Sequence, residues 1–407
     1  MVGILSFCGC WCRRRLVEGS AADGRCLASW SCAAGYLVQF RVMSGQIAAK
    51  SCRRLLVAIP NWVGDVVLAS PTLAALRAHF RHARIIYLLR RYVHEIVAGC
   101  GWHDDVVYWP EQRGWAGVMG MPRLAGRLKA ERCDAALLLT NSFRSALAVR
   151  LARIPRRVGY AREGRGWLLT DRLRPLKRDG EFVPRSVVHY YAELAEHVGC
   201  PVSDGQPRLA ATPEQERQGA RLREHYGLDD GRPYALINPG AKFGASKCWL
   251  PERFAALCDR LADEHGLWPV LVGAPGEHPL MRDIAARTGR PVVCCDDPGT
   301  TLGSLKVLVR GAALLVCNDT GPRHYGIAFN VPTVTIFGPT HQEWTDTGYR
   351  DEIKLQAAVE CGPCQLPRCP LDLRCMTAIS TDDVVRAANE LLQRRPPVAV
   401  PVAVHED

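Results

Sequence analysis

The stretch LLVAIPNWVGDVVLASPTLAAL, residues 55–76, decides how the first half of this chain folds. Its apolar start predicts a buried strand over 55–60, and its later apolar periodicity predicts a helix over 70–80. The turn between them carries a single glycine and a single aspartate, Gly64 and Asp65. Because a nucleotide-binding turn carries three glycines, we expect Asp65 to have a different task at that end of the sheet.

The same strand–turn–helix rhythm continues beyond this stretch. The further predicted strands over 84–89 and 134–139 are nearly continuous apolar runs, as in a parallel sheet with helices on both faces. The first half is therefore predicted to be a doubly wound α/β domain. Its other strands are expected over 84–89, 134–139 and 156–160, and its other helices over 92–99, 143–152 and 183–200.

The second half restarts this rhythm after a polar connection. Residues 201–233 are rich in Pro, Gly and charge around one charged helix, which favours an inter-domain linker. We predict two Rossmann-like domains, 51–208 and 209–380, with a cleft between the carboxyl ends of their sheets. A last helix over 381–395 is expected to pack back on the first domain.

The composition fits two domains and a polyanionic partner. Of 407 residues, 48% are hydrophobic and 23% are charged, which is enough for two cores. The net charge of +11 suits nucleic acid, a nucleotide diphosphate or an anionic membrane surface without choosing among them. Two of the eighteen cysteines, Cys258 and Cys317, lie in apolar patterns and are interpreted as core residues in a reducing compartment. No apolar run reaches the roughly 20 residues of a membrane span.

The first 50 residues stand apart from this pattern. Residues 1–42 contain five cysteines and no clear period, and the triplet Arg13, Arg14 and Arg15 follows an apolar stretch instead of preceding it. That order is wrong for a secretory signal. We expect residues 1–50 to be a disordered extension, or the product of an upstream start with Met43 as the true one.

The segment VCNDTGPRH predicts an anion site in the second half. An apolar strand runs into Asp319, Thr320 and Gly321, and then into a helix that carries His324. Unpaired N–H groups and the helix dipole favour an anion at such a start. The alternative, that Asp319 or Thr320 is simply a helix cap, is equally compatible with this pattern.

Two further turns are expected at the same end of the second sheet. NPGAKFGASKCW places Lys247 in a loop after Gly240, where a lysine can neutralise a departing diphosphate; a solvated surface lysine is the alternative. LVGAPGE ends a strand with Glu277, whose carboxylate can accept ribose hydroxyls or only interact with a helix dipole.

The chain has no D-x-D pair to carry a divalent cation for a nucleotide sugar. Charge on a leaving diphosphate would then be met by Lys247 and a helix N-terminus. Across the cleft, the carboxylate of Asp65 suits a general base that takes a proton from an acceptor hydroxyl. An N-cap of the following helix is the alternative for Asp65.

A cysteine segment near the C-terminus, CGPCQLPRCPLDLRC, has the spacing C-x₂-C-x₄-C-x₅-C. Four thiolates at this spacing could hold Zn²⁺ or an iron–sulfur cluster. A loop of buried or redox-active thiols is an equal alternative. The residues are Cys361, Cys364, Cys369 and Cys375.

Taken in order, NWVGDVVLASPTLAAL, NPGAKFGASKCW, NDTGPRH and the cysteine segment resemble glycosyltransferase family 9 over about residues 53–392. The resemblance is closest to the ADP-heptose:lipopolysaccharide heptosyltransferases of type II. It implies a GT-B fold, with the acceptor on the N-terminal domain and ADP-heptose on the C-terminal one. It also implies inverting transfer of heptose from ADP-L-glycero-D-manno-heptose to an inner-core sugar on lipid A, with no metal cofactor required.

The resemblance also assigns roles by motif. Asp65 matches the general base, and Asn61 and Gly64 lie on the acceptor side. The donor side takes Gly240, Lys247, Glu277, Asp319, Thr320, Gly321 and His324. Pro322 and Arg323 depart from the family's small apolar residues, which leaves the sugar open.

The expected setting is cytoplasmic, peripheral on the inner face of the inner membrane. Arginines near the acceptor side, at positions 77, 81, 84, 90 and 91, would suit anionic core and lipid phosphates. Three other functions stay open: transfer of another nucleotide-activated sugar, a nucleotide-sugar epimerase, and a basic nucleic-acid-binding protein with cysteine-bound metal. Nucleic acid is not the expected partner, because the arginines are scattered and no base-reading element is present.

Overall fold

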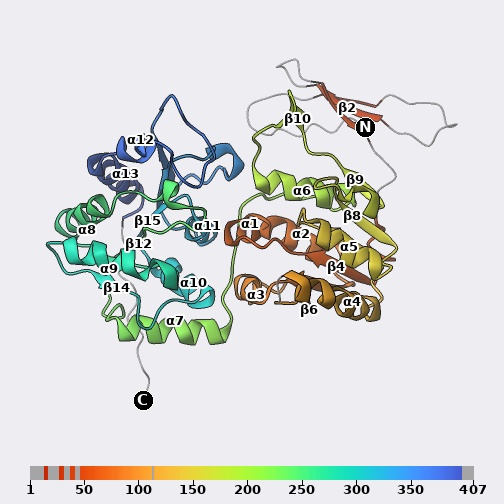
Figure 1. The fold of residues 1–407 in the computed structure, drawn as a ribbon, viewed down its shortest axis with the longest axis horizontal. Coiled ribbons are helices and arrows are strands. Elements are labelled where there is room, and N and C mark those ends of the chain that lie inside the picture. The colour runs from red at the N-terminus through yellow and green to blue at the C-terminus, as the bar shows by residue number, and fades with distance from the viewer. Residues whose placement is uncertain (1–12, 17–26, 32–36, 42–45, 112–113, 397–407) are drawn as a thin grey trace.

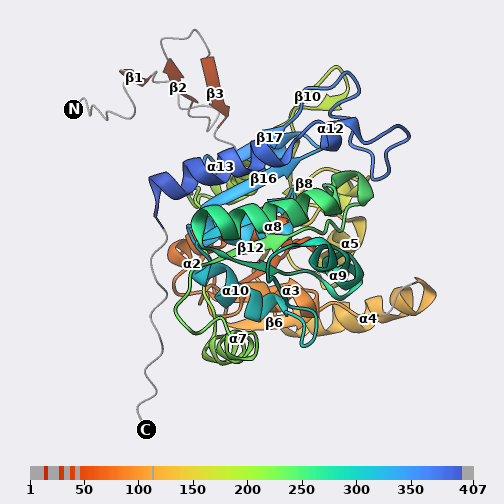
Figure 2. The same ribbon diagram turned by 90° about the vertical axis from the view of Figure 1, so that its left-hand side faces the viewer.

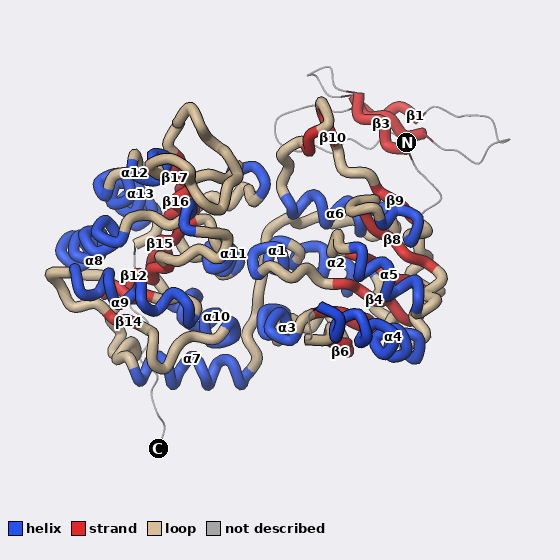
Figure 3. The backbone as a smooth tube through the Cα atoms, in the orientation of Figure 1, coloured by secondary structure: helices blue, strands red, loops and turns tan. Residues whose placement is uncertain are grey.

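Two halves of the chain lie side by side in the computed structural model (Figure 1). The structure describes residues 13–16, 27–31, 37–41, 46–111 and 114–396. Each half is built on a six-stranded sheet in which all neighbouring strands run parallel. Helices flank the strands in both halves (Figure 3). The predicted α/β class with two doubly wound domains is confirmed.

The first sheet grows from the opening stretch of sequence. In β4, Leu55, Leu56 and Val57 are fully buried because helices cover both faces, and Leu56 pairs with Ile86 on one side and Ala136 on the other. In sheet order the strands are β6 (Asp105–Tyr108), β5 (Arg84–Leu89), β4 (Arg54–Ala58), β7 (Ala135–Leu138), β8 (Arg156–Tyr160) and β9 (Asp171–Leu173).

The second sheet repeats this winding. Its strand order, counted along its own half of the chain, is the same as in the first sheet, and reverses direction between β12 and β15 as the first does between β4 and β7. Ligands bind at such switch points, outside the carboxyl ends of the strands. In sheet order the strands are β14 (Val293–Cys294), β13 (Trp268–Leu271), β12 (Tyr234–Asn238), β15 (Leu314–Asn318), β16 (Thr333–Phe337) and β17 (Glu352–Gln356).

The helices connect these strands. Those of the first half are α1 (Val63–Leu68), α2 (Ser70–His79), α3 (Arg91–Val97), α4 (Gly114–Ala130), α5 (Phe143–Leu151), the 3-10 turn η1 (Arg165–Leu168) and α6 (Val187–His197). Those of the second half are α7 (Pro213–His225), η2 (Ala245–Lys247), α8 (Pro251–His265), η3 (Pro275–Glu277), α9 (His278–Arg287), α10 (Leu302–Gly311), α11 (Gly321–Ala328), η4 (Gln342–Trp344), α12 (Arg374–Thr377) and α13 (Thr381–Arg394). In the described part of the chain, none of the helices has the length and apolar character needed to cross a membrane.

Several elements differ from the prediction. The helix predicted over 70–80 is preceded by a separate turn of helix, α1, that begins directly after the β4 turn. The sequence reading missed α4, whose glycines and Pro122 are poor helix formers, and the short strands β6, β9 and β17. All three strands lie at the edges of their sheets, where burial is weaker and the apolar pattern is correspondingly short or interrupted.

The last helix does not pack back on the first domain as expected. α13 lies on α8 and on β16 and β17, and this is visible in Figure 2. Val384, Ala388 and Leu391 are buried there in the core of the second half, so the apolar face of α13 is already covered. That expectation is therefore corrected.

The chain passes between the halves through residues 201–212, and α7 then packs against α10 in the second half.

Near the N-terminus the structure describes three short antiparallel strands where we expected a disordered extension: β1 (Arg13–Leu16), β2 (Leu27–Ser31) and β3 (Leu37–Arg41). The rest of the first 45 residues, Met43 included, lies outside the described residues. A further hairpin, β10 (Lys177–Arg178) and β11 (Glu181–Phe182), follows β9.

Candidate active site

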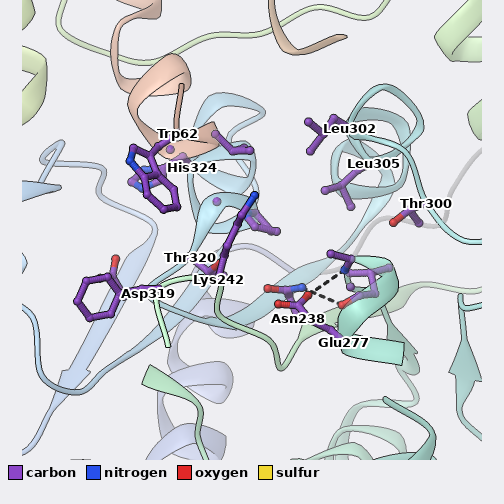
Figure 4. A pocket seen from close by; sticks show the side chains of 18 of the residues that line it. Trp62, Asn238, Lys242, Glu277, Thr300, Leu302, Leu305, Asp319, Thr320 and His324 are labelled. Carbon is purple, nitrogen blue, oxygen red and sulfur yellow. Dashed lines mark hydrogen bonds between the residues drawn. The ribbon is translucent and has the colours of Figure 1, made fainter. Parts of the chain in front are cut away.

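A cavity of about 420 Å³ lies between the two halves, at the carboxyl ends of their strands (Figure 4). Eight of the ten predicted site residues line it, with Gly64 and Asp65 from the first half and six from the second: Lys247, Glu277, Asp319, Thr320, Gly321 and His324. Asn61 and Gly240 lie beside the cavity without lining it. The cavity therefore lies where the strand order reverses in both sheets, between β4 and β7 and between β12 and β15.

Asp65 is held in the first turn of α1. The N-cap of this helix is Trp62, which makes no side-chain cap bond, so the alternative that Asp65 is the N-cap is wrong. Burial raises the pKa of the Asp65 carboxyl from its ordinary value of 3.8 to about 6. A carboxylate with such a pKa is mostly ionised at neutral pH and is basic enough to accept a proton.

Gly64 explains why the turn carries a glycine. A Cβ at this position would lie 2.8 Å from Cδ2 and 3.0 Å from Nε2 of His324, which comes from α11 in the other half. The missing side chain therefore lets α1 and α11 approach closely. His324 is buried, and burial together with the neighbouring Arg323 charge lowers its pKa to about 3, which keeps the imidazole neutral.

Lys247 and Asp319 form a buried ion pair at the base of the cavity. The Lys247 ammonium donates to the Asp319 carboxylate and, at 3.3 Å, to its backbone carbonyl. Thr340 donates a further bond of 2.8 Å to the same carboxylate. Burial would raise the pKa of Asp319, but the charges of Lys247 and Arg323 outweigh it and hold the pKa below its ordinary value. The Lys247 side chain is 11% exposed, so it is not a solvated surface lysine.

Arg323 supports this pair from behind and does not line the cavity. Its guanidinium is fully buried, with Nε 2.5 Å from Oε1 of Glu352, and Nη1 3.6 Å from Oδ1 of Asp319. Nη1 also donates to the Thr345 hydroxyl at 2.6 Å. The departure from the family's small residue at this position is thus matched by a carboxylate on β17.

The start of α11 faces the cavity with unused donors. Thr320 is its N-cap by position, but no side-chain cap bond forms, and Asp319 is engaged by Lys247 instead. Neither side chain therefore serves as a helix cap. Thr320, Gly321 and Pro322 line the cavity, where first-turn N–H groups without helical partners favour an anion.

Glu277 lines the cavity, and Gly240 lies behind its side chain. The Glu277 carboxylate accepts a bond of 2.8 Å from the backbone N–H of Ala274. A Cβ on Gly240 would lie 2.0 Å from the carboxyl carbon of Glu277, so the glycine makes room for this side chain. In the first half, beside the cavity, the Asn61 side-chain oxygen is buried and accepts no bond from any described residue.

Sequence reasoning missed part of the lining. Trp62 is 58% exposed beside Gly64, and an exposed tryptophan in a turn is a signal that could have found it. Lys242, in the same loop as Lys247, also lines the cavity and was not among the predicted site residues. Leu302 and Leu305 on α10 add an apolar wall that only the fold brings to the cavity (Figure 4).

The four cysteines do not form a metal site among the described residues. Cys361 and Cys364 are exposed, Cys369 is half-buried and Cys375 is buried. No group of three or more His, Cys, Asp or Glu in the described ranges is arranged to hold a metal ion. The predicted Zn²⁺ or iron–sulfur cluster is not supported.

Comparison with known families points to one of them. The family model described as glycosyltransferase family 9 (heptosyltransferase) matches residues 121–373. Lipopolysaccharide heptosyltransferase 2 of Escherichia coli (strain K12) is 29% identical over 298 residues, which are 72% of this chain and 84% of that protein. Lipooligosaccharide heptosyltransferase 2 of Campylobacter jejuni (strain ATCC 700819) is 22% identical, covering 84% of this chain and 98% of that protein.

Solved structures share the fold. A family 9 glycosyltransferase from Veillonella parvula aligns with a TM-score of 0.73 at 20% identity, covering 86% of this chain and 100% of that one. The E. coli ADP-heptose LPS heptosyltransferase II aligns with a TM-score of 0.70 at 23% identity, covering 84% and 99%. The predicted GT-B architecture is therefore confirmed.

Proposed function

Because this chain belongs to glycosyltransferase family 9, we propose that it transfers heptose from ADP-L-glycero-D-manno-heptose to an inner-core sugar of lipopolysaccharide. One observation carries this proposal. A carboxylate whose pKa is raised to about 6, Asp65, shares a single cavity with a lysine and a helix N-terminus that suit a diphosphate. The relatives named heptosyltransferase 2 support the choice of heptose.

In the proposed step the acceptor hydroxyl lies beside Asp65. The carboxylate takes the hydroxyl proton as the oxygen attacks the anomeric carbon of the heptose. A new C–O bond forms on one face while the bond from the anomeric carbon to the ADP oxygen breaks on the other, with its electron pair leaving on ADP. The configuration at the anomeric carbon is thereby inverted.

The departing charge is met by the second half of the chain. Lys247 and the first-turn N–H groups of α11 face the position where the diphosphate would develop charge. We propose that this arrangement takes the place of a divalent cation, since the sequence has no D-x-D pair. Glu277 is positioned to accept the ribose hydroxyls.

The acceptor side belongs to the first half, with Asn61 and Gly64 next to Asp65. We propose that the acceptor is the inner core of lipid A and that the enzyme works in the cytoplasm, at the inner face of the inner membrane. Transfer of a different nucleotide-activated sugar is the remaining alternative, because Pro322 at the cavity differs from the family pattern.

The test is ADP release from ADP-heptose, with and without a heptose-terminated lipid A core acceptor. Wild type is expected to release ADP only with acceptor. Asp65→Asn should lose about 10²–10⁴-fold in turnover while still binding ADP. Asp229→Asn, at an exposed position outside the cavity, is the matched control and should keep wild-type turnover.

The outcomes separate the parts of the proposal. If ADP binds but no heptose is transferred, the proposed nucleotide site is supported and heptose is wrong as the transferred sugar. If the Asp65→Asn variant retains wild-type turnover, Asp65 is not the general base. If ADP does not bind at all, the nucleotide-sugar function is wrong.

A further inference from the structure

Three large apolar side chains are exposed along one edge of the first half. Trp167 is 67% exposed, Leu176 is 65% exposed and Phe143 is 37% exposed. The Phe143 and Trp167 rings lie 6.2 Å apart between centroids. A set of apolar side chains gathered in this way marks an interaction surface, whereas single exposed ones do not.

The sheet explains why these residues gather. Phe143 follows β7, Trp167 follows β8 and Leu176 follows β9, and these three strands are neighbours in the sheet. Because the strands are parallel, the loops after them emerge at one edge, the carboxyl edge. Asp65 follows β4, the next strand along, and so lies at this same edge.

Cations surround the apolar side chains. Arg162, Arg174 and Lys177 line a second cavity of about 600 Å³ beside the β10–β11 hairpin, together with Phe182. The Phe182 ring contacts the Arg162 guanidinium at 4.1 Å and the Lys177 ammonium at 4.6 Å. No described carboxylate forms a salt bridge with these three cations, although Glu163 lines the same cavity.

The arginines that we first expected to serve an anionic surface are arranged differently. Arg77, Arg84 and Arg91 are ion-paired with Asp104, Asp105 and Glu111. Arg84 begins β5, so it lies at the amino edge of the sheet, opposite Asp65. The charges of Arg77, Arg84 and Arg91 are therefore partly neutralised by these carboxylates, and Arg84 also lies away from the cleft.

We propose that Phe143, Trp167 and Leu176, with Arg162, Arg174 and Lys177, form a docking face that binds an anionic lipid surface. Exposed tryptophan and leucine insert into the headgroup region, while unpaired cations attract anionic lipids. Charge complementarity favours a membrane over a protein of unspecified charge. The inference rests on the proposed function in one respect: a lipid-anchored acceptor would reach Asp65 at this edge.

The test is co-sedimentation of the full chain with vesicles, without donor or acceptor. Vesicles of phosphatidylethanolamine and phosphatidylglycerol are compared with phosphatidylcholine alone, at low and high salt. Wild type is expected to bind the anionic vesicles, and less at high salt. Arg174→Gln with Lys177→Gln should weaken binding about tenfold or more. Trp167→Ser with Leu176→Ser should weaken it by a similar factor.

Two controls match these variants in chemistry but not in position. Arg127→Gln with Lys129→Gln removes the same charge from exposed positions on α4, and Leu366→Ser with Leu371→Ser removes exposed apolar side chains of the second half. Both are expected to bind anionic vesicles as wild type does. A soluble, deacylated acceptor should be turned over equally by all variants, whereas an acceptor embedded in vesicles should be turned over slowly by the docking-face variants.

The proposal is overturned if wild type fails to bind anionic vesicles, or if the control variants lose binding as much as the docking-face variants. It is also overturned if the docking-face variants change the self-association of the chain in lipid-free solution and nothing else, since the face would then join two copies. Vesicle binding needs no sugar donor, so a failure of heptose transfer leaves this result unaffected.

Discussion

At Asp65 the pKa shift predicts the pH dependence of turnover. Burial raises the carboxyl pKa to about 6, and a general base acts in its ionised form. The rate should therefore rise with pH up to about 6 and stay level above it, falling about tenfold per pH unit below. A pH profile of kcat/KM for the acceptor measures this. A profile that is flat across pH 6 would contradict the assignment.

The same pKa shift predicts that the stability of the protein falls with rising pH over the range in which turnover rises. The unfolded carboxyl ionises near 3.8 and the folded one near 6, so its contribution to stability is full below 3.8 and is lost as pH rises through 6. At neutral pH, Asp65→Asn should raise the free energy of unfolding by on the order of 2 kcal/mol. Denaturant unfolding of both proteins checks this, and Asp229→Asn should leave stability unchanged.

Glu352 is predicted to hold Arg323 away from Asp319. Glu352→Gln removes the nearer of the two carboxylates that face the fully buried Arg323 guanidinium, which should cost about 3 kcal/mol of stability. Arg323 would then compete with Lys247 for Asp319, so the KM for the donor should rise more than kcat falls. Glu343→Gln, in the same region with its side chain 65% exposed, is the control. Equal donor KM values in both variants would contradict this role.

At the scale of elements, close approach between loops shapes the site. A Cβ on Gly240 would overlap Glu277, whereas a Cβ on Gly276, in the Glu277 turn itself, would meet nothing within 4 Å. Gly240→Ala should therefore displace Glu277 and raise the donor KM about tenfold. Gly276→Ala should match wild type. Equilibrium binding of ADP to the two variants decides this, and equal affinities would reject the role of Gly240.

At the scale of the whole molecule, a buried lysine joins the two halves. Lys306 on α10 donates to the carbonyls of Ala98 in the first half and Ala210 in the connection, at 2.8 and 2.7 Å. It donates also to the Gln215 side chain on α7, at 3.1 Å. The lysine therefore connects the first half, the linker and the second half at one buried position.

Lys306→Met should loosen this junction. It leaves buried oxygens without a donor, which should cost about 1–3 kcal/mol. We expect a lower melting temperature, a larger radius of gyration by small-angle scattering, and faster proteolysis within residues 201–212. Lys129→Met, at an exposed position on α4, is the control. An unchanged radius and cleavage rate in Lys306→Met would show that the junction is held by other contacts.

The architecture could be predicted from the amino-acid sequence, because the apolar patterns that specify it are local. The apolar runs in β4, β5 and β7 predicted the positions of these strands to within a residue or two, because a strand buried on both faces must be apolar throughout. Asp65, Lys247 and Asp319 could be found because they follow such strands, and parallel strands bring their carboxyl ends together.

Features that depend on contacts between residues far apart in the chain could not be predicted and are seen only in the folded protein. Nothing near Gly64 in sequence shows that His324 lies against it, and nothing near Arg323 reveals Glu352 on β17. The position of α13, the junction at Lys306 and the docking face arise from packing between segments far apart in the chain. Local sequence patterns indicate which residues must be buried. Which distant residue each of them contacts is determined only when the chain folds.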